Sequence, residues 1–416
     1  MRSWPETGPE VLWTVDVGIG YGGPVIKDGK VYLLDRDDEI GDKMRCFDLN
    51  NGEELWKFEY DAPGEVMFPG SRSVPIVDDK HVYSCGPYGD LYCIDILTKQ
   101  PVWNVNVWTD FGGKPGNAPR EEGAPQFSRE PGGFPTWAIS QCPLIYGDLL
   151  IIASQTPEVG VVAYDKNTEE VKWKTPSLGQ TGYVSPTVVK IDNNDQVVMI
   201  TASSGGRGGQ PVKPGNVVGI DPLTGEKLWE FNNWLCRIPV PSAVDAGDNK
   251  LLITGGYEPG ALMIQLEKQA DGTFDTKELF RTEEFGDQTK TPILYEGYFY
   301  AEYGTNNTRD GLTCMNMEGE IMWKTMRDPD FNKGSMIIAD GLMLATDGLK
   351  MLYLIEPNPI EFKPLASVEI LGERKEGDSM SSRFGGRTQN WAPLALADGK
   401  LLIRDQNRML CVRIAE

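Results

Sequence analysis

Histidine is almost absent from this 416-residue chain, in which His81 is the only one. A His-rich metal site is therefore excluded, and a Ser-His-Asp triad is disfavoured because a single histidine would have to carry it. His81 lies in a turn-to-strand stretch, where we interpret it as a surface or packing residue.

Positive charge and long apolar runs are also scarce. The chain has 61 Asp plus Glu against 40 Lys plus Arg, which gives a net charge of −21. Such a charge repels nucleic acid and anionic membrane surfaces, so no nucleic-acid partner is expected. No apolar run approaches the ~20 residues of a membrane span, and residues 1–20 lack the basic and apolar regions of a signal peptide. We expect this chain to be soluble.

No two of the seven cysteines are adjacent. Four occupy one equivalent place in a repeat, two residues before its turn acid or the residue that replaces it: Cys46, Cys93, Cys314 and Cys411. A recurring small, buried strand position explains them better than disulfides, since equivalent points of different units should lie too far apart to bridge. The other three, Cys85, Cys142 and Cys236, give no indication of the redox compartment.

The repeat itself is an aspartate followed eight residues later by a tryptophan. Residues 217–229 illustrate it: two short apolar strands flank a turn in which Asp221 can accept backbone N–H bonds and Gly225 can take a positive φ. The copies with identical spacing are Asp48/Trp56, Asp95/Trp103, Asp165/Trp173 and Asp221/Trp229, and Asn316/Trp323 is one residue shorter. We expect the indoles to wedge between neighbouring units, with ligand contact as the alternative.

A hairpin with a polar turn, usually introduced by proline, precedes each of these turns. The eight copies span 24–32, 75–83, 143–151, 186–200, 241–253, 292–300, 336–344 and 393–403; the fourth is expected to turn at Asn193-Asn194. Hairpin plus turn gives four antiparallel strands per unit, and eight such sheets form a β-propeller. We therefore predict one all-β domain over residues 1–416, an eight-bladed propeller whose last blade is completed by the N-terminal strand around Trp13.

Two units are degenerate, which leaves seven blades as the alternative count. In the fifth, residues 262–266 and a longer turn come after the hairpin, and Phe280 replaces the tryptophan. In the seventh, residues 353–356 replace the turn acid, and Pro357 and Pro359 displace the segment after it.

The motif x-Asp-x-x-Thr-Gly-x-x-x-Trp at 220–229 resembles the pyrroloquinoline-quinone (PQQ)-type propeller repeat, and the resemblance covers nearly the whole chain. It implies a relation to quinoprotein alcohol dehydrogenases, which bind the quinone and Ca²⁺ at one end of the ring. It equally implies a relation to non-catalytic proteins such as the propeller lipoprotein of the outer-membrane barrel-assembly machinery. The adjacent cysteines and the Cys-x-x-Cys-His haem motif found in such dehydrogenases are absent here.

Long loops indicate where a ligand or partner could bind. Between Trp103 and Pro143 lie 39 residues that join an outermost strand to the next innermost one, and further insertions occupy 35–43, 203–215 and 303–311. Both kinds of loop leave an up-and-down blade at the same face. Growth of loops on one face favours a binding face, although neutral loop growth is the alternative.

The residues just before the innermost strands should surround the ring axis on that face. They are Tyr21, Arg72, Trp137, Tyr183, Arg237, Lys290, Lys333 and Trp391. Four cations and four aromatics suit an anionic or carbohydrate-like ligand. Alternatively, the aromatics pack the loops and the cations pair with acids such as Asp287 and Glu302.

Other candidate sites are weaker. The acidic stretch 35–42 could loosely hold Ca²⁺, but it lacks the spacing of an EF-hand and is interpreted as a solvated loop. The Gly-rich stretch 203–209 has no Gly-Lys-Ser/Thr ending for a phosphate loop. Catalytic residues are not indicated, and no metal site is assigned.

These patterns lead to three functional hypotheses. The leading one is a non-catalytic binding or scaffold protein, periplasmic or secreted with its signal peptide outside this chain, that needs no cofactor and holds a protein or an extended ligand on the insert-bearing face. The alternative is a PQQ-dependent dehydrogenase of alcohols or sugars, with the quinone carboxylates on Arg72, Arg237 or Lys290 beside Ca²⁺. A third is a carbohydrate-active enzyme with its carboxylates at the same end of the ring.

Overall fold

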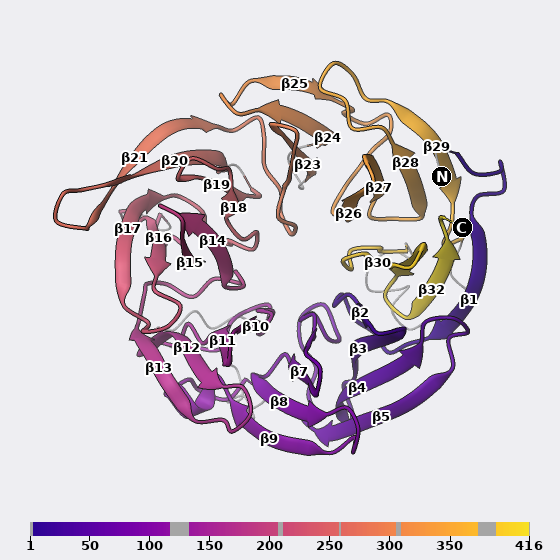
Figure 1. Ribbon diagram of the computed structural model, residues 1–416, viewed down its shortest axis with the longest axis horizontal. Coiled ribbons are helices and arrows are strands. Elements are labelled where there is room, and N and C mark those ends of the chain that lie inside the picture. Colours follow the sequence, from indigo (N-terminus) through magenta and orange to yellow (C-terminus); the bar gives the residue numbers. More distant parts are fainter. Residues whose placement is uncertain are drawn as a thin grey trace.

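Eight four-stranded antiparallel sheets stand around one axis in the computed structural model (Figure 1), as the repeat predicts. The structure describes residues 3–116, 133–206, 211–257, 259–304, 309–372 and 388–415. In each blade the shortest strand lies innermost and the strand with the tryptophan outermost, except in the blades where another residue replaces it. The prediction of eight blades is confirmed.

The first four blades take their strands in chain order from the axis outward. They are β2 (Val25–Lys27), β3 (Lys30–Asp37), β4 (Gly41–Asp48) and β5 (Glu54–Asp61); β6 (Ile76–Val77), β7 (His81–Cys85), β8 (Asp90–Asp95) and β9 (Pro101–Asn106); β10 (Leu144–Tyr146), β11 (Leu149–Ala153), β12 (Val159–Asp165) and β13 (Val171–Pro176); β14 (Thr187–Ile191), β15 (Asn194–Ile200), β16 (Gly215–Ile220) and β17 (Lys227–Trp234). A short 3₁₀ helix, η1 (Thr109–Phe111), comes after β9.

The other four blades continue around the ring. They are β18 (Val244–Asp245), β19 (Lys250–Gly255), β20 (Gly260–Lys268) and β21 (Phe274–Thr282); β22 (Ile293–Tyr295), β23 (Tyr298–Gly304), β24 (Arg309–Asn316) and β25 (Ile321–Lys324); β26 (Met336–Ala339), β27 (Leu342–Thr346), β28 (Met351–Ile355) and β29 (Pro364–Glu369); β30 (Ala395–Ala397), β31 (Lys400–Arg404), β32 (Arg408–Arg413) and β1 (Glu10–Asp16). In the part of the chain that the structure describes, no helix has the length and apolar character needed to cross a membrane.

The N-terminal strand closes the ring. β1 pairs antiparallel with β32, from Glu10 opposite Arg413 to Asp16 opposite Arg408, so the eighth blade is built from both ends of the chain (Figure 1). Trp13 is 8% exposed and its indole Nε1 donates to the Leu49 carbonyl of the first blade at 2.9 Å. The predicted closure is confirmed.

The repeated tryptophans connect consecutive blades. The indole Nε1 atoms of Trp103, Trp173 and Trp323 donate to carbonyls in the outer turn of the following blade, at 3.0, 3.1 and 2.7 Å. Gly225, with φ +75°, lies directly against Trp173, and a Cβ there would approach the ring to 2.5 Å. The aspartate and the glycine of one repeat thus shape the turn that receives the tryptophan of the preceding one, which confirms the wedge.

The recurrent cysteines lie where a small side chain is needed. Cys46, Cys93, Cys314 and Cys411 each stand opposite a tryptophan of the neighbouring strand, and all four are buried free thiols. In the fourth blade Gly219 takes this place, and a Cβ there would approach the indole of Trp229 to 2.1 Å. A small, apolar residue under the indole is the common requirement, as predicted.

Two predictions about single segments were wrong. The fourth hairpin turns at Asp192-Asn193, because Ile191 pairs with Asn194. The stretch 35–43 is neither an insertion nor a solvated loop: β3 and β4 run through it, with Asp35 opposite Lys43. The degenerate fifth blade keeps its architecture, with Phe280 of β21 packed against Gly319 of the next blade as the predicted substitute.

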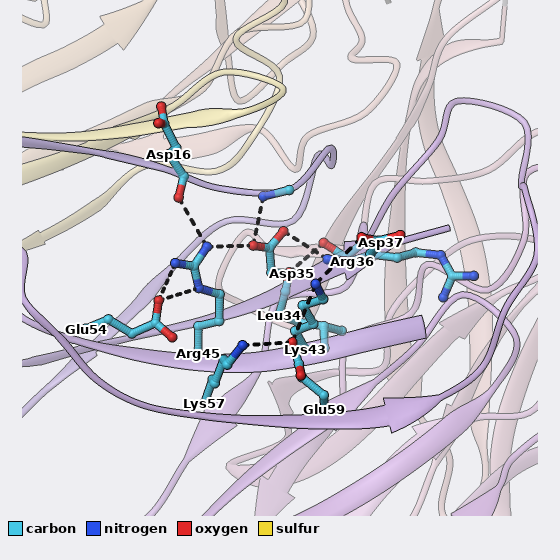
Figure 2. Close-up of polar contacts among 12 residues, drawn as sticks. Asp16, Leu34, Asp35, Arg36, Asp37, Lys43, Arg45, Glu54, Lys57 and Glu59 are labelled. Atoms are coloured by element: carbon cyan, nitrogen blue, oxygen red, sulfur yellow. Dashed lines mark hydrogen bonds and ion pairs between the residues drawn. The ribbon is translucent and has the colours of Figure 1, made fainter. Parts of the chain in front are cut away.

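Two acids of the stretch 35–42, Asp35 and Asp42, are buried and ion-paired. Asp35 is 1% exposed and accepts hydrogen bonds from the backbone N–H of Gly18 and from Arg45 at 2.8 and 3.0 Å. Figure 2 shows Arg45 between Asp35, Glu54 and the main chain of Asp16. These contacts join the N-terminal strand to the first blade. They also supply the partners that a buried carboxylate needs.

Candidate functional site

The loops from second to third strands, and from fourth strands to the next blade, leave at one end of the ring because all neighbouring strands are antiparallel. We call this end the insert-bearing face. Seven predicted residues lie there, just before innermost strands, and all are half-buried. We call them the crown: Tyr21, Arg72, Trp137, Tyr183, Lys290, Lys333 and Trp391.

Aromatic rings from three blades meet in the crown. Tyr21 stacks on Trp391 with 5.4 Å between ring centroids, and Phe68 contacts both rings at 6.2 and 6.1 Å. The Nζ of Lys333 lies 4.9 Å from the centroid of Trp391. The hydroxyl of Tyr21 donates to Gln389 at 2.8 Å. Stacking and the cation-π contact fix these side chains relative to each other.

Arg72 joins main-chain segments of two blades. Its guanidinium donates to the carbonyls of Met67 (2.8 Å) and Phe68 in its own loop, and to the carbonyl of Trp137 before the third blade. Burial lowers the pKa of Arg72 to about 10, because a charged guanidinium loses hydration there. Trp137 in turn packs edge-on against Tyr183, at 5.5 Å between centroids.

Lys290 makes the corresponding contact on the other side of the ring. Its Nζ donates to the carbonyl of Trp391 at 2.7 Å. Burial lowers its pKa, which the nearby carboxylates of Asp287 and Glu302 partly counteract. Each of these two cations therefore holds the main chain at a crown tryptophan, which is a positioning role.

Arg237 differs from the other predicted residues. It lies between β17 and β18 on the same face, but its side chain is exposed and forms no ion pair or ring contact with the described residues. It belongs to the rim of the insert-bearing face rather than to the crown.

The backbone of the crown is strained. Phe68, Lys333 and Ala138, the residue after Trp137, have φ values of 57°, 63° and 58°. Non-glycine residues adopt this left-handed conformation at a cost of about 1 kcal/mol or more, and such residues cluster at functional sites. At Lys333 this conformation accompanies the contact of its Nζ with the ring of Trp391.

Several residues of this region escaped the sequence reasoning. Phe68 and Gln389 complete the aromatic cluster, and Asn390 lies fully buried beside it. Periodicity identifies the residue directly before an innermost strand, but it does not identify neighbours that reach the same place from a curved loop. Asp287 and Glu302, named as pairing partners for crown cations, are 1% and 2% exposed.

The described residues do not fit a calcium-bound quinone. They contain no group of three or more His, Cys, Asp or Glu side chains that could hold a metal ion. Calcium needs six to eight oxygen ligands, several of them carboxylates. Both terminal nitrogens of Arg72, Nη1 and Nη2, donate to main-chain carbonyls. They are therefore not free to form a bidentate hydrogen-bond pair with a carboxylate of a ligand.

The eight-bladed fold and the repeated Asp/Trp motif are those of a PQQ-like β-propeller. Comparison with known proteins agrees. A family model described as outer membrane protein assembly factor BamB matches residues 4–114 and 41–233, which is more than half of the chain. The chain therefore belongs to this family of PQQ-like propellers.

Similar solved structures include BamB and dehydrogenases. BamB from Moraxella catarrhalis superposes with a TM-score of 0.61 at 11% identity, over 97% of this chain and 100% of that one. A europium-containing methanol dehydrogenase gives 0.61 at 13% identity, over 95% and 84%. At these identities the likeness concerns the fold.

One curated relative is a quinoprotein ethanol dehydrogenase from Pseudomonas putida. It is 25% identical over 178 residues, which is 42% of this chain and 24% of that protein. This chain thus matches about a quarter of the enzyme's length.

Proposed function

We propose that this protein is a non-catalytic scaffold that acts outside the cytoplasm and binds a protein partner on its insert-bearing face. The observation that carries the proposal is that two crown cations bind the main chain of the protein itself. Arg72 donates to the carbonyl of Trp137, and Lys290 donates to the carbonyl of Trp391. The crown is therefore a preorganised surface of aromatic rings with Lys333 on it, and such surfaces are typical of protein recognition. The family's description as an outer-membrane assembly factor supports the location.

Two enzymatic alternatives are less well supported. The match to a quinoprotein ethanol dehydrogenase favours quinone chemistry, but the donor set beside the crown does not fit calcium. A carbohydrate-active enzyme needs two carboxyl groups at the substrate. Asp287 and Glu302, the carboxyl groups beneath the crown, are too deeply buried to reach a glycosidic bond.

Site-specific photocrosslinking in cells tests the proposed face. A photoreactive amino acid at Arg237, on the rim of the insert-bearing face, is expected to give one discrete adduct whose partner mass spectrometry identifies. The matched control carries the label at Leu223, which is 67% exposed in a turn at the opposite end of the ring, and should give none.

The adduct must also depend on the crown. Excess unlabelled protein should suppress it, whereas the variant Tyr21→Ala/Trp391→Ala should compete poorly because it lacks the stacked pair. Equal adducts from both ends of the ring, or competition by the variant as strong as by the native protein, would contradict the proposal.

A further inference from the structure

Two buried carboxyl groups lie beside the crown cation Lys290, at the junction of the sixth, seventh and eighth blades. Asp287 and Lys290 belong to the loop before β22, and Glu302 belongs to β23. Both carboxyl groups are almost fully buried, with exposures of 1% and 2%. The crown's binding surface does not require them to touch a ligand, so they need another explanation.

Their hydrogen bonds connect the inner loops of three blades. Asp287 Oδ1 accepts from the backbone N–H groups of Thr289 and Lys290, at 2.9 and 2.8 Å. Glu302 Oε2 accepts from the N–H of Gly334, beside Lys333, at 2.6 Å. The Nζ of Lys290 reaches the carbonyl of Trp391 before the eighth blade. The cluster thus holds the backbone from which the cation and the indole of the crown project.

One oxygen of each carboxyl group has no hydrogen-bond partner among the described residues: Oδ2 of Asp287 and Oε1 of Glu302. A buried carboxylate oxygen without a partner is costly, and the usual relief is retention of a proton. With one proton on the two acids and the charge on Lys290, these three groups are together neutral.

The charged groups around the cluster strengthen this preference. Burial raises the pKa of Asp287 to about 6 against hydrogen bonds and the charge of Lys290, which lower it. Burial raises the pKa of Glu302 well above its usual value, and Asp287 and Asp347 raise it further while Lys290 lowers it. Lys290 also faces Cys142 of the third blade.

We propose that Asp287, Lys290 and Glu302 form a proton-linked latch that holds the crown in its binding geometry while one proton is retained and loosens it when that proton is lost. The loss leaves two anions and one cation in a buried place, so Lys290 is drawn from the Trp391 carbonyl and the loops of the three blades separate. The latch does not depend on which partner the crown binds.

The sign of the pH dependence is set by linkage. The native state binds more protons than the unfolded chain above the ordinary pKa of these acids, so stability falls as pH rises through the native pKa values. Glu302→Gln keeps an acceptor for the N–H of Gly334 and cannot ionise. This variant should therefore lose the part of the pH dependence of stability that Glu302 contributes.

Fluorine NMR of the protein labelled with 5-fluorotryptophan tests the latch, with the resonance of Trp391 assigned through Trp391→Phe. Between pH 5 and 9 that resonance should titrate in the native protein, with its midpoint at the pH where the fall in melting temperature levels off. In Glu302→Gln the Trp391 change should vanish and the melting temperature should keep only the slope that Asp287 contributes. In Asp287→Asn the midpoint should shift, so the test does not depend on a single variant that folds.

Asp42→Asn is the matched control, because Asp42 is another buried carboxyl group whose pKa is raised to about 6, but it lies in β4 of the first blade. It should leave the Trp391 titration unchanged. A Trp391 resonance that does not titrate in the native protein, or one that titrates identically in Glu302→Gln, would overturn the latch.

Discussion

Deletion of residues 1–17 is expected to lower the melting temperature sharply and to open the ring. The deleted segment includes Trp13, whose indole is buried and donates to Leu49, and the Asp16 carbonyl, which accepts from Arg45. Loss of a buried tryptophan alone costs about 3–5 kcal/mol. The last blade would also expose the unpaired edge of β32, so the loss should exceed that of the indole. Differential scanning calorimetry measures it.

Two point variants separate closure from a general effect of the N-terminus. Trp13→Ala should reproduce much of the loss, whereas Val11→Ala on the same strand should change little, because Val11 is 46% exposed. A synthetic peptide of residues 3–18 added to the truncated protein should restore the transition. An unchanged melt of the truncated protein would show that β1 does not close the ring.

Arg36→Met should destabilise the protein by about 3–5 kcal/mol, the usual cost of leaving one partner of a buried ion pair alone. The guanidinium of Arg36 is inaccessible and donates to Asp38 and Asp42 at 2.8 Å each, and to the carbonyls of Ala62 and Gly64 at 2.8 and 2.7 Å. Methionine retains the length of the side chain and removes all four bonds. Urea denaturation measures the free energy of unfolding.

The defect should grow with pH. Burial already raises the pKa of Asp42 to about 6 despite Arg36, so without Arg36 the native state holds its proton more strongly. The free energy of unfolding of Arg36→Met should therefore fall as pH rises above about 6, and the double variant Arg36→Met/Asp42→Asn should recover part of the loss. A double variant no more stable than Arg36→Met would refute this account.

Much of the fold is readable from the sequence because each repeat carries its own constraints. Three residue types recur at fixed spacing: an aspartate that accepts turn N–H bonds, a glycine beneath an indole, and a small residue opposite the tryptophan. Each can be recognised within a short stretch of sequence. Buried ion pairs between side chains of different blades were not predicted. Residues 35–42 look like a hydrated acidic loop because the arginines that bury Asp35 and Asp42 come partly from elsewhere in the chain, including Arg404 of the last blade.

The candidate site was predicted only in outline. The position before an innermost strand identifies seven residues of the crown. It does not determine which contacts a long side chain makes or whether that side chain is exposed. Arg237 obeys the rule in sequence and is nevertheless exposed on the rim. Phe68 enters the aromatic cluster because its left-handed backbone turns its loop, and no motif marks that conformation.

The central claim is that the crown is a recognition surface and not a quinone site. Calorimetric titration of the protein with pyrroloquinoline quinone in the presence of Ca²⁺, repeated with Arg72→Ala/Lys290→Ala, tests it most directly. We predict no saturable heat and no thermal shift with either protein. Saturable binding at micromolar concentration or tighter that the double variant loses would contradict the claim and would make the protein a quinone-binding propeller.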